Sequence, residues 1–185
     1  MLSFTSRLSS DCNAFAIFVT EKYSYKDPKN ILPNNIVQKI NSYLGVLEAK
    51  KKEEEISFFD ISNQQKCFII KVKNKHESYY PEEIGGTLFS CIKQFKEIKK
   101  VELYADSLTL DSEKISKFFS EFILGFSLKS YTFNKYKTLD KNKINNKIDF
   151  KIITTHKNKI QFNYKYCDAI REGVFLTRDL VSEPP

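Results

Sequence analysis

Six consecutive apolar residues near the start of the chain constrain its fold more than any other feature. The run from Ala14 to Val19 is apolar at every position, whereas a strand with one face in water alternates apolar and polar residues. A continuous run of this kind is typical of a strand buried on both faces, as in a parallel sheet between helices. The run therefore predicts an α/β domain.

Strand-like and helix-like segments alternate along the rest of the chain. Short apolar runs predict further strands at 56–61, 67–72, 101–105 and 150–154, the first two joined as a hairpin. Apolar residues at steps of three and four predict helices at 37–47, 81–95, 112–126 and 160–181. We therefore expect an α/β fold with a mixed, mostly parallel sheet of about five to six strands flanked by helices.

Composition indicates a folded domain without a membrane span. The chain has 185 residues, of which 41% are hydrophobic, so it is too apolar to be disordered. No stretch approaches the roughly 18 uninterrupted apolar residues of a membrane span, and the N-terminus lacks the pattern of a secretory signal. We expect a cytoplasmic protein. The cysteines form no Cys-x-x-Cys pair, so we expect free thiols and no zinc site at Cys12, Cys67, Cys91 and Cys167.

The net charge of +7 is concentrated in one segment. Residues 129–165 hold ten lysines against Asp140 and Asp149, a balance of 10 − 2 = +8, which leaves −1 for the rest of the chain. Such a block can form a surface that binds anions. The enrichment in Lys, Asn, Ile and Phe also fits the compositional drift of an AT-rich genome, and we favour that explanation.

Residues that carry chemistry are sparse and scattered. The two histidines, His76 and His156, both stand in polar surroundings, which favours exposed loop positions over a catalytic or metal-binding role. Gly85-Gly86 lies in the second predicted helix without a phosphate-binding motif, so close packing of that helix on the sheet explains it better. The acids Asp106, Asp111 and Glu113 are explained by helix capping and the helix dipole. We therefore assign no catalytic, cofactor-binding or metal-binding residue.

The last stretch of the chain carries a family resemblance. The run Ala169-Ile170-Arg171-Glu172-Gly173-Val174-Phe175-Leu176-Thr177-Arg178-Asp179-Leu180-Val181-Ser182-Glu183-Pro184-Pro185 resembles the inter-domain segment of the leucyl aminopeptidase family, the two-metal cytosol aminopeptidases. The order of predicted elements upstream is similar to that of the family's N-terminal domain, which is macro-domain-like. The resemblance thus implies a macro-like domain at 1–158 and an inter-domain linker helix at 159–185, with the catalytic domain absent from the chain.

The resemblance also implies a function for the parent enzyme. The parent would remove N-terminal amino acids from peptides with two divalent ions, Mn or Zn, that activate a water. The family's metal ligands and catalytic residues belong to the downstream domain, so none carries over and the segment itself is expected to be inactive. Its implied partners are the catalytic domain of the same chain and the other subunits of a homo-hexamer.

Two other functions remain open. A nucleic-acid-binding module would use the Lys-rich segment 129–165 against phosphates, with weak, non-specific DNA binding as the expected strength. A stand-alone macro domain that binds ADP-ribose would need glycine-rich loops, and the chain has five glycines in all. We rank the macro-domain function last.

The end of the closing helix is expected to be its weakest part. Val174, Leu180 and Val181 lie on an apolar stripe that packs partly against the catalytic domain in the resembled enzymes. Without such a partner a helix loses much of its stability, and terminal segments fray first. We therefore expect fast amide exchange from Thr177 onward and weak dimerisation in concentrated solution.

Overall fold

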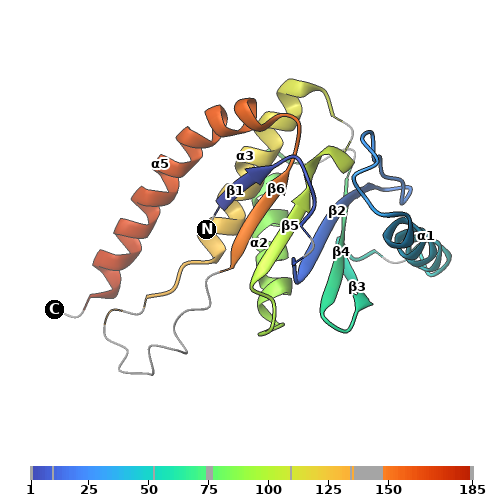
Figure 1. Cartoon of the computed structure of the whole chain (residues 1–185). Coiled ribbons are helices and arrows are strands. Elements are labelled where there is room, and N and C mark those ends of the chain that lie inside the picture. Colours follow the sequence, from blue (N-terminus) through green and yellow to red (C-terminus); the bar gives the residue numbers. More distant parts are fainter. Residues whose placement is uncertain are drawn as a thin grey trace. The chain divides into compact units, whose positions relative to one another are not determined.

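The computed structural model of the chain (Figure 1) describes residues 2–9, 11–51, 53–73, 77–108, 110–133, 135 and 148–183. It divides into two compact units. One, here called the sheet unit, comprises residues 1–76, 97–110 and 148–157, and the other, the helix unit, comprises 77–96, 111–147 and 158–185. Each unit is built from segments that are distant in sequence.

The sheet unit holds one mixed sheet. Its strands, within the described residues, are β1 (Leu2–Thr5), β2 (Ala14–Thr20), β3 (Ile56–Ser62), β4 (Gln65–Val72), β5 (Lys100–Tyr104) and β6 (Asp149–Ile153). They lie in the order β1-β6-β5-β2-β4-β3 (Figure 1). Every pairing is parallel except that of β3 with β4, which form the predicted hairpin. The predicted α/β fold with a mostly parallel sheet is confirmed.

Strand β2 lies inside the sheet and is buried on both faces. It pairs with β4 on one side and β5 on the other, and every residue from Ala14 to Val19 is fully buried. A strand in this place must be apolar at odd and even positions alike. The position of β2 inside the sheet therefore explains why the run from Ala14 to Val19 is apolar throughout.

Strand β1 was not predicted. Its four residues include Ser3 and Thr5, and none is fully buried, so the sequence pattern carries little signal. The strand forms because it pairs in parallel with β6, with Leu2 opposite Phe150. Because β1 and β6 are far apart in the sequence, their pairing depends on the completed fold and not on local propensity.

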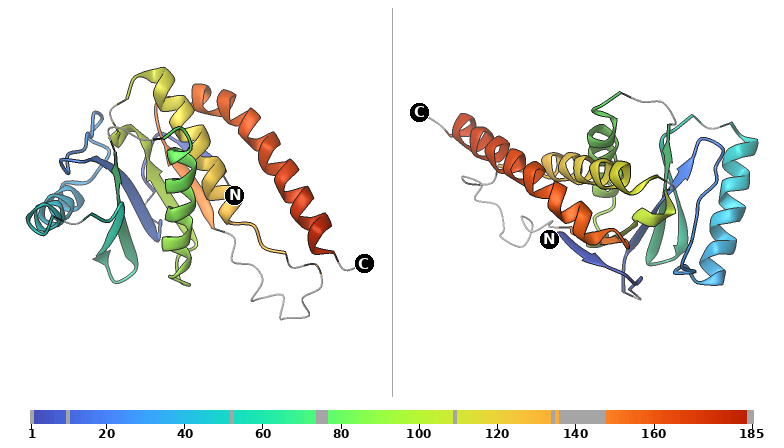
Figure 2. Two further views of the ribbon diagram at one scale, coloured as in Figure 1. Left: turned by 180° about the vertical axis from the view of Figure 1, so that it is seen from behind. Right: turned by 90° about the horizontal axis from the view of Figure 1, so that it is seen from above.

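Helix α1 (Asn34–Ala49) packs against one face of this sheet, beside which it runs in Figure 2. Its buried side chains are Ile36, Ile40, Leu44 and Leu47. They join inward side chains of the strands, among them Phe15, Ile17, Val19, Cys67, Ile69 and Tyr104. Each such apolar side chain stabilises the fold by about 1.5–3 kcal/mol through removal from water.

Within the described residues, the helix unit holds α2 (Tyr80–Lys93), α3 (Ser112–Lys129) and α5 (Lys157–Ser182). The predicted phenylalanine stripe of α3 is confirmed as core: Phe118, Phe119, Phe122 and Phe126 are each at most 5% exposed. Asp111 caps this helix by accepting a hydrogen bond from the Lys114 amide at 2.9 Å. The long C-terminal helix is also confirmed, while its role as an inter-domain linker stays a prediction.

Glycines bring α2 and α3 into close contact. A Cβ at Gly85 would lie 2.9 Å from the carbonyl carbon of Phe122, and one at Gly125 would lie 2.6 Å from that of Glu82. Both distances are shorter than real side chains tolerate, so the two backbones touch. The expectation that Gly85 packs on the sheet was therefore wrong, because its contact is with another helix.

Candidate functional site

The carboxyl ends of β2 and β5 are the first place to seek a ligand site. Chain connections diverge there, and open α/β sheets commonly bind ligands at such a switch point. In this protein the place is filled by its own side chains. The Asp27 carboxylate accepts hydrogen bonds from the Tyr104 hydroxyl at 2.7 Å and from the amides of Ile31 and Leu32, both at 2.9 Å.

Further bonds close the same crevice. The Ser107 hydroxyl accepts from the Phe18 amide at 2.8 Å and donates to the Tyr104 carbonyl at 2.6 Å. Burial, together with the neighbouring Asp27 carboxylate, raises the pKa of the Tyr104 phenol. The phenol therefore remains a neutral donor to Asp27. The hydrogen bonds at this switch point hold the loops after β2 and β5 in place.

A pocket of about 530 Å³ opens at this end of the sheet unit. Its walls are residues that follow β1 and β2, including Ser6, Arg7, Lys29 and Pro33. Arg7 and Lys29 are both exposed, and no buried polar side chain lines the pocket. It is a basic surface depression without a built recognition site.

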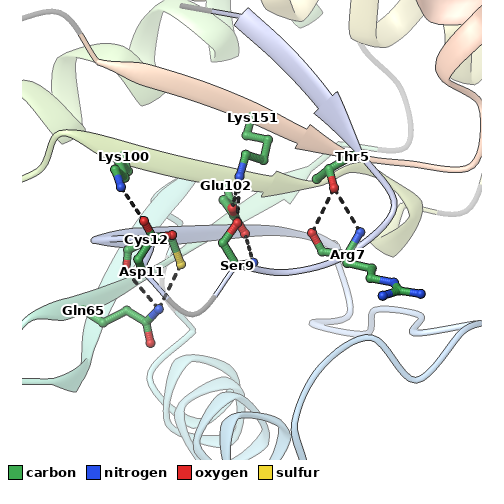
Figure 3. Close-up of polar contacts among 9 residues, drawn as sticks. All are labelled: Thr5, Arg7, Ser9, Asp11, Cys12, Gln65, Lys100, Glu102 and Lys151. Atoms are coloured by element: carbon green, nitrogen blue, oxygen red, sulfur yellow. Dashed lines mark hydrogen bonds and ion pairs between the residues drawn. The ribbon is translucent and has the colours of Figure 1, made fainter.

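A buried polar cluster occupies the neighbouring strands β5 and β6 (Figure 3). Glu102, only 2% exposed, lies opposite Lys151 in the sheet register, and the Lys151 Nζ is 3.0 Å from its Oε1. The Ser9 amide donates to Glu102 Oε2 at 2.8 Å, and Lys151 Nζ also donates to Ser9 Oγ at 2.7 Å. We call these three residues the Glu102 cluster.

Contacts beside the Glu102 cluster hold the residues that precede β2. Asp11 forms an ion pair with Lys100, which lowers the pKa of the Asp11 carboxyl and raises that of the Lys100 ammonium. Gln65 Nε2 donates to the Cys12 carbonyl at 3.1 Å and lies 3.0 Å from the Cys12 Sγ (Figure 3). Burial raises the pKa of the Cys12 thiol, with the Glu102 charge adding to the effect.

A serine within hydrogen-bond reach of a lysine is a pattern that some hydrolases use for nucleophilic attack. In those enzymes the lysine acts as a base and must be neutral. Here Lys151 Nζ forms an ion pair with Glu102 and donates a hydrogen bond to Ser9 Oγ, so it is not placed as an acceptor from the serine hydroxyl. The Glu102 cluster therefore fastens the segment between β1 and β2 to the sheet.

The sequence analysis missed this cluster although a signal was present. Glu102 interrupts the apolar run from Val101 to Tyr104, and Lys151 interrupts the run from Phe150 to Ile153. Opposite charges at equivalent positions of two apolar strands indicate a buried cross-strand pair. Glu102 and Lys151 become neighbours only because β5 pairs with β6, and this pairing cannot be predicted from the sequence pattern.

The residues weighed from sequence lie apart. Asp106 does not cap a helix: it accepts from the Thr154 hydroxyl at 2.7 Å and the Thr155 amide at 2.8 Å, which corrects the expectation of capping. His156 is half-buried beside β6, whereas His76 lies outside the described residues. All four cysteines are free thiols.

Neither a metal centre nor a membrane span is found in the described part of the chain. No group of three or more His, Cys, Asp or Glu residues in it is placed to hold a metal ion. None of its helices is long and apolar enough to cross a bilayer.

The described part of the Lys-rich segment 129–165 is partly engaged in ion pairs. Lys151 belongs to the Glu102 cluster, and Lys135 pairs with Glu183. Lys137, Lys141, Lys143 and Lys147 lie outside the described residues.

Comparisons with known proteins decide the family. No family model matches the chain. The probable cytosol aminopeptidase of Phytoplasma mali (strain AT) is 31% identical over 196 residues, which cover 99% of this chain and 38% of that protein. That of Phytoplasma australiense is 25% identical, covering 95% of this chain and 35% of its own length. The chain belongs to the cytosol aminopeptidase family.

Solved structures agree on the fold. A tomato leucine aminopeptidase variant superposes with a TM-score of 0.66 at 20% identity, covering 99% of this chain and 38% of that one. The macrodomain of Thermus aquaticus DarG superposes with a TM-score of 0.52 at 12% identity, covering 83% and 98%. The macro-domain-like fold is thus confirmed. This aminopeptidase-family chain corresponds to the N-terminal domain and spans little more than a third of its relatives' length.

Proposed function

We propose that this chain is the non-catalytic N-terminal domain of a cytoplasmic leucyl aminopeptidase. The observation that carries the proposal is the coverage: a family relative matches 99% of this chain with only 38% of its own length. The parent enzyme would remove N-terminal amino acids from peptides. Its reacting groups would lie in the larger part of the relatives that this chain does not match.

The chemistry of the described residues supports this division. Two-metal hydrolysis needs carboxylates that converge on two ions a few ångströms apart. The described residues do not fit such a centre, because no group of three or more His, Cys, Asp or Glu residues among them converges on one point. The two divalent ions, Mn or Zn, would belong to the catalytic domain. This domain would contribute to assembly of a homo-hexamer and to its regulation.

Hydrolysis of a leucyl anilide tests the proposal. The purified chain should show no turnover with added Mn²⁺ or Zn²⁺, whereas the full-length Phytoplasma mali relative, assayed alongside, should be active. Metal-dependent turnover by the chain that is lost on Glu102→Gln, with the fold retained by circular dichroism, would contradict the proposal. Turnover that survives this change and tracks a contaminant in chromatography would leave the chain itself inactive, as proposed.

A further inference from the structure

A second pocket of the sheet unit is lined mainly by charged residues. Its volume is about 210 Å³, and its walls include Ser3, Asp11, Lys100, Glu102, Asp149 and Lys151. Lys100 and Asp149 are the first residues of β5 and β6, so the pocket lies at the amino ends of these strands, away from the switch point described above. We call it the charged pocket.

The strand residues of the charged pocket share one face of the sheet. Lys100 and Glu102 stand two residues apart on β5, as Asp149 and Lys151 do on β6, and side chains two apart in a strand point to the same face. The register sets Lys100 opposite Asp149 and Glu102 opposite Lys151, while Ser3 of β1 lies opposite Lys151 on its other side. Each lysine therefore has an acid as its cross-strand neighbour, and the pocket offers both signs of charge side by side.

The charged pocket has a buried floor and an exposed rim. Glu102, at the floor, is 2% exposed and is held by Lys151 at 3.0 Å. At the rim, the side chains of Asp11 and Lys100 are 63% and 51% exposed and form an ion pair with each other (Figure 3). The Asp11 carboxylate raises the pKa of the Lys100 ammonium, and the Asp149 carboxylate adds to this effect. An exposed ion pair of this kind is weak, so a ligand with its own charges can replace it.

The lining charges favour a ligand that carries both an ammonium and a carboxylate. Three acids and two lysines give the pocket a net charge of 2 − 3 = −1, which disfavours phosphate and other simple anions. A simple cation would in turn be repelled by Lys100 at the rim. A zwitterion avoids both penalties, because its carboxylate would bind Lys100 while its ammonium would bind Asp11 and Asp149.

The size of the charged pocket restricts the ligand further. Pockets for drug-sized molecules have volumes of roughly 300–1,000 Å³, and this one is smaller, at about 210 Å³. The combination of small size and paired charges matches a single amino acid. We propose that the charged pocket binds the zwitterion of a free α-amino acid, which takes the place of the ion pair between Asp11 and Lys100 as the partner of each. The buried pair of Glu102 and Lys151 stays intact beneath it.

An NMR titration of the ¹⁵N-labelled chain tests this site. L-alanine, added at about 0.15 M salt so that exposed charges are screened, should shift the amide signals of Glu102, Asp149 and Lys151 saturably. We expect a dissociation constant of about 1 mM. Ethylamine is L-alanine without its carboxylate, and propionate is L-alanine without its ammonium. Each should bind at least about tenfold more weakly than L-alanine, because each leaves one sign of charge in the pocket without a partner.

Two substitutions at the rim assign the two charges of the ligand. Lys100→Gln removes the partner of the carboxylate and Asp149→Asn a partner of the ammonium, so each should weaken L-alanine binding about tenfold. Lys100→Gln should also abolish the preference for L-alanine over ethylamine. Asp60→Asn, the same kind of substitution in the exposed ion pair with Lys66, is the matched control and should leave the affinity unchanged. The dispersion of the amide spectrum checks that each variant folds.

Three results would overturn the proposal. One is the absence of saturable shifts in the charged pocket up to about 100 mM L-alanine, a hundred times the expected dissociation constant. The second is ethylamine or propionate that binds the unmodified chain as tightly as L-alanine, because the pocket would then recognise one charge only. The third is a set of shifts that Lys100→Gln and Asp149→Asn leave unchanged, because the ligand would then lie elsewhere. None of these measurements depends on peptidase activity, so the site and the proposed function fail or stand separately.

Discussion

A single charged pair shows how this fold handles burial of polar groups. Glu102 is almost fully buried, and an isolated carboxylate there would be costly. Lys151 and the Ser9 amide satisfy both of its oxygens. Among the described residues, no buried side-chain nitrogen or oxygen lacks a hydrogen-bond partner. The pair therefore gives the segment before β2 a defined place, in return for the desolvation of two charges.

Glu102→Gln tests the contribution of this pair. The amide still accepts from Ser9, but Lys151 loses its counter-charge, so we expect the free energy of unfolding to fall by about 1–3 kcal/mol. Urea denaturation followed by circular dichroism measures the change. Asp60→Asn, which breaks an exposed ion pair with Lys66, is the control and should cost less than about 1 kcal/mol. Equal losses would show that the burial of Glu102 has no energetic role.

Asp111 gives a pH-dependent prediction. Hydrogen bonds from the Lys114 amide and ammonium lower the pKa of the Asp111 carboxyl. A carboxyl with a lowered folded-state pKa stabilises the fold above its unfolded value, about 3.9, and loses that contribution as the pH falls through the folded value. Asp111→Asn keeps the cap but not the charge. Its melting temperature should fall below that of the unmodified chain near neutral pH and approach it in acid. A difference independent of pH would contradict this account.

At the scale of elements, the hydrophobic periodicity of the sequence predicted those helices and strands whose formation depends on nearby residues. The four long helices and five of the strands follow from periodicity, because each buries a stripe or a face that the sequence displays. Strand β1 and the partner of Gly85 did not follow, because both depend on which elements meet. The Glu102 cluster escaped for the same reason. In the closing helix, Ile160 and Cys167 are buried, whereas Ile170 is exposed.

The contact between α2 and α3 can be tested with two glycines. Alanine in a helix is favoured over glycine by roughly 0.5–1 kcal/mol, and Gly45→Ala in α1, where a Cβ meets nothing within 4 Å, should stabilise the protein by that amount. Gly125→Ala should instead destabilise it by about 1–3 kcal/mol, since its Cβ would clash with the backbone at Glu82. Thermal or urea denaturation of the two variants gives the comparison. Stabilisation by both would show that the helices are farther apart.

At the scale of the whole molecule, two residues of the run that resembles the family have a structural role. Arg178 and Asp179 of the family-like run bind the chain at the end of α3, through the Leu128 carbonyl and the Tyr131 hydroxyl. Of the apolar residues in the same run, Phe175 packs against the Tyr131 ring with centroids 5.1 Å apart, whereas Leu176, Leu180 and Val181 are exposed. Sequence periodicity alone could not separate the two sides, since α5 carries apolar residues on both. The exposed side became recognisable only once the packed side was known.

Amide hydrogen exchange tests whether the end of α5 is the least stable part of the helix. In dilute solution, exchange should be fast from Thr177 onward, because the apolar side chains Leu180 and Val181 of the last turns are exposed, and slow in the buried run from Ala14 to Val19. Mass spectrometry of peptides from both segments measures the two exchange rates. Full protection through Leu180 in a dilute monomer would contradict this prediction, because the bonds of Arg178 and Asp179 would then suffice to hold the helix end.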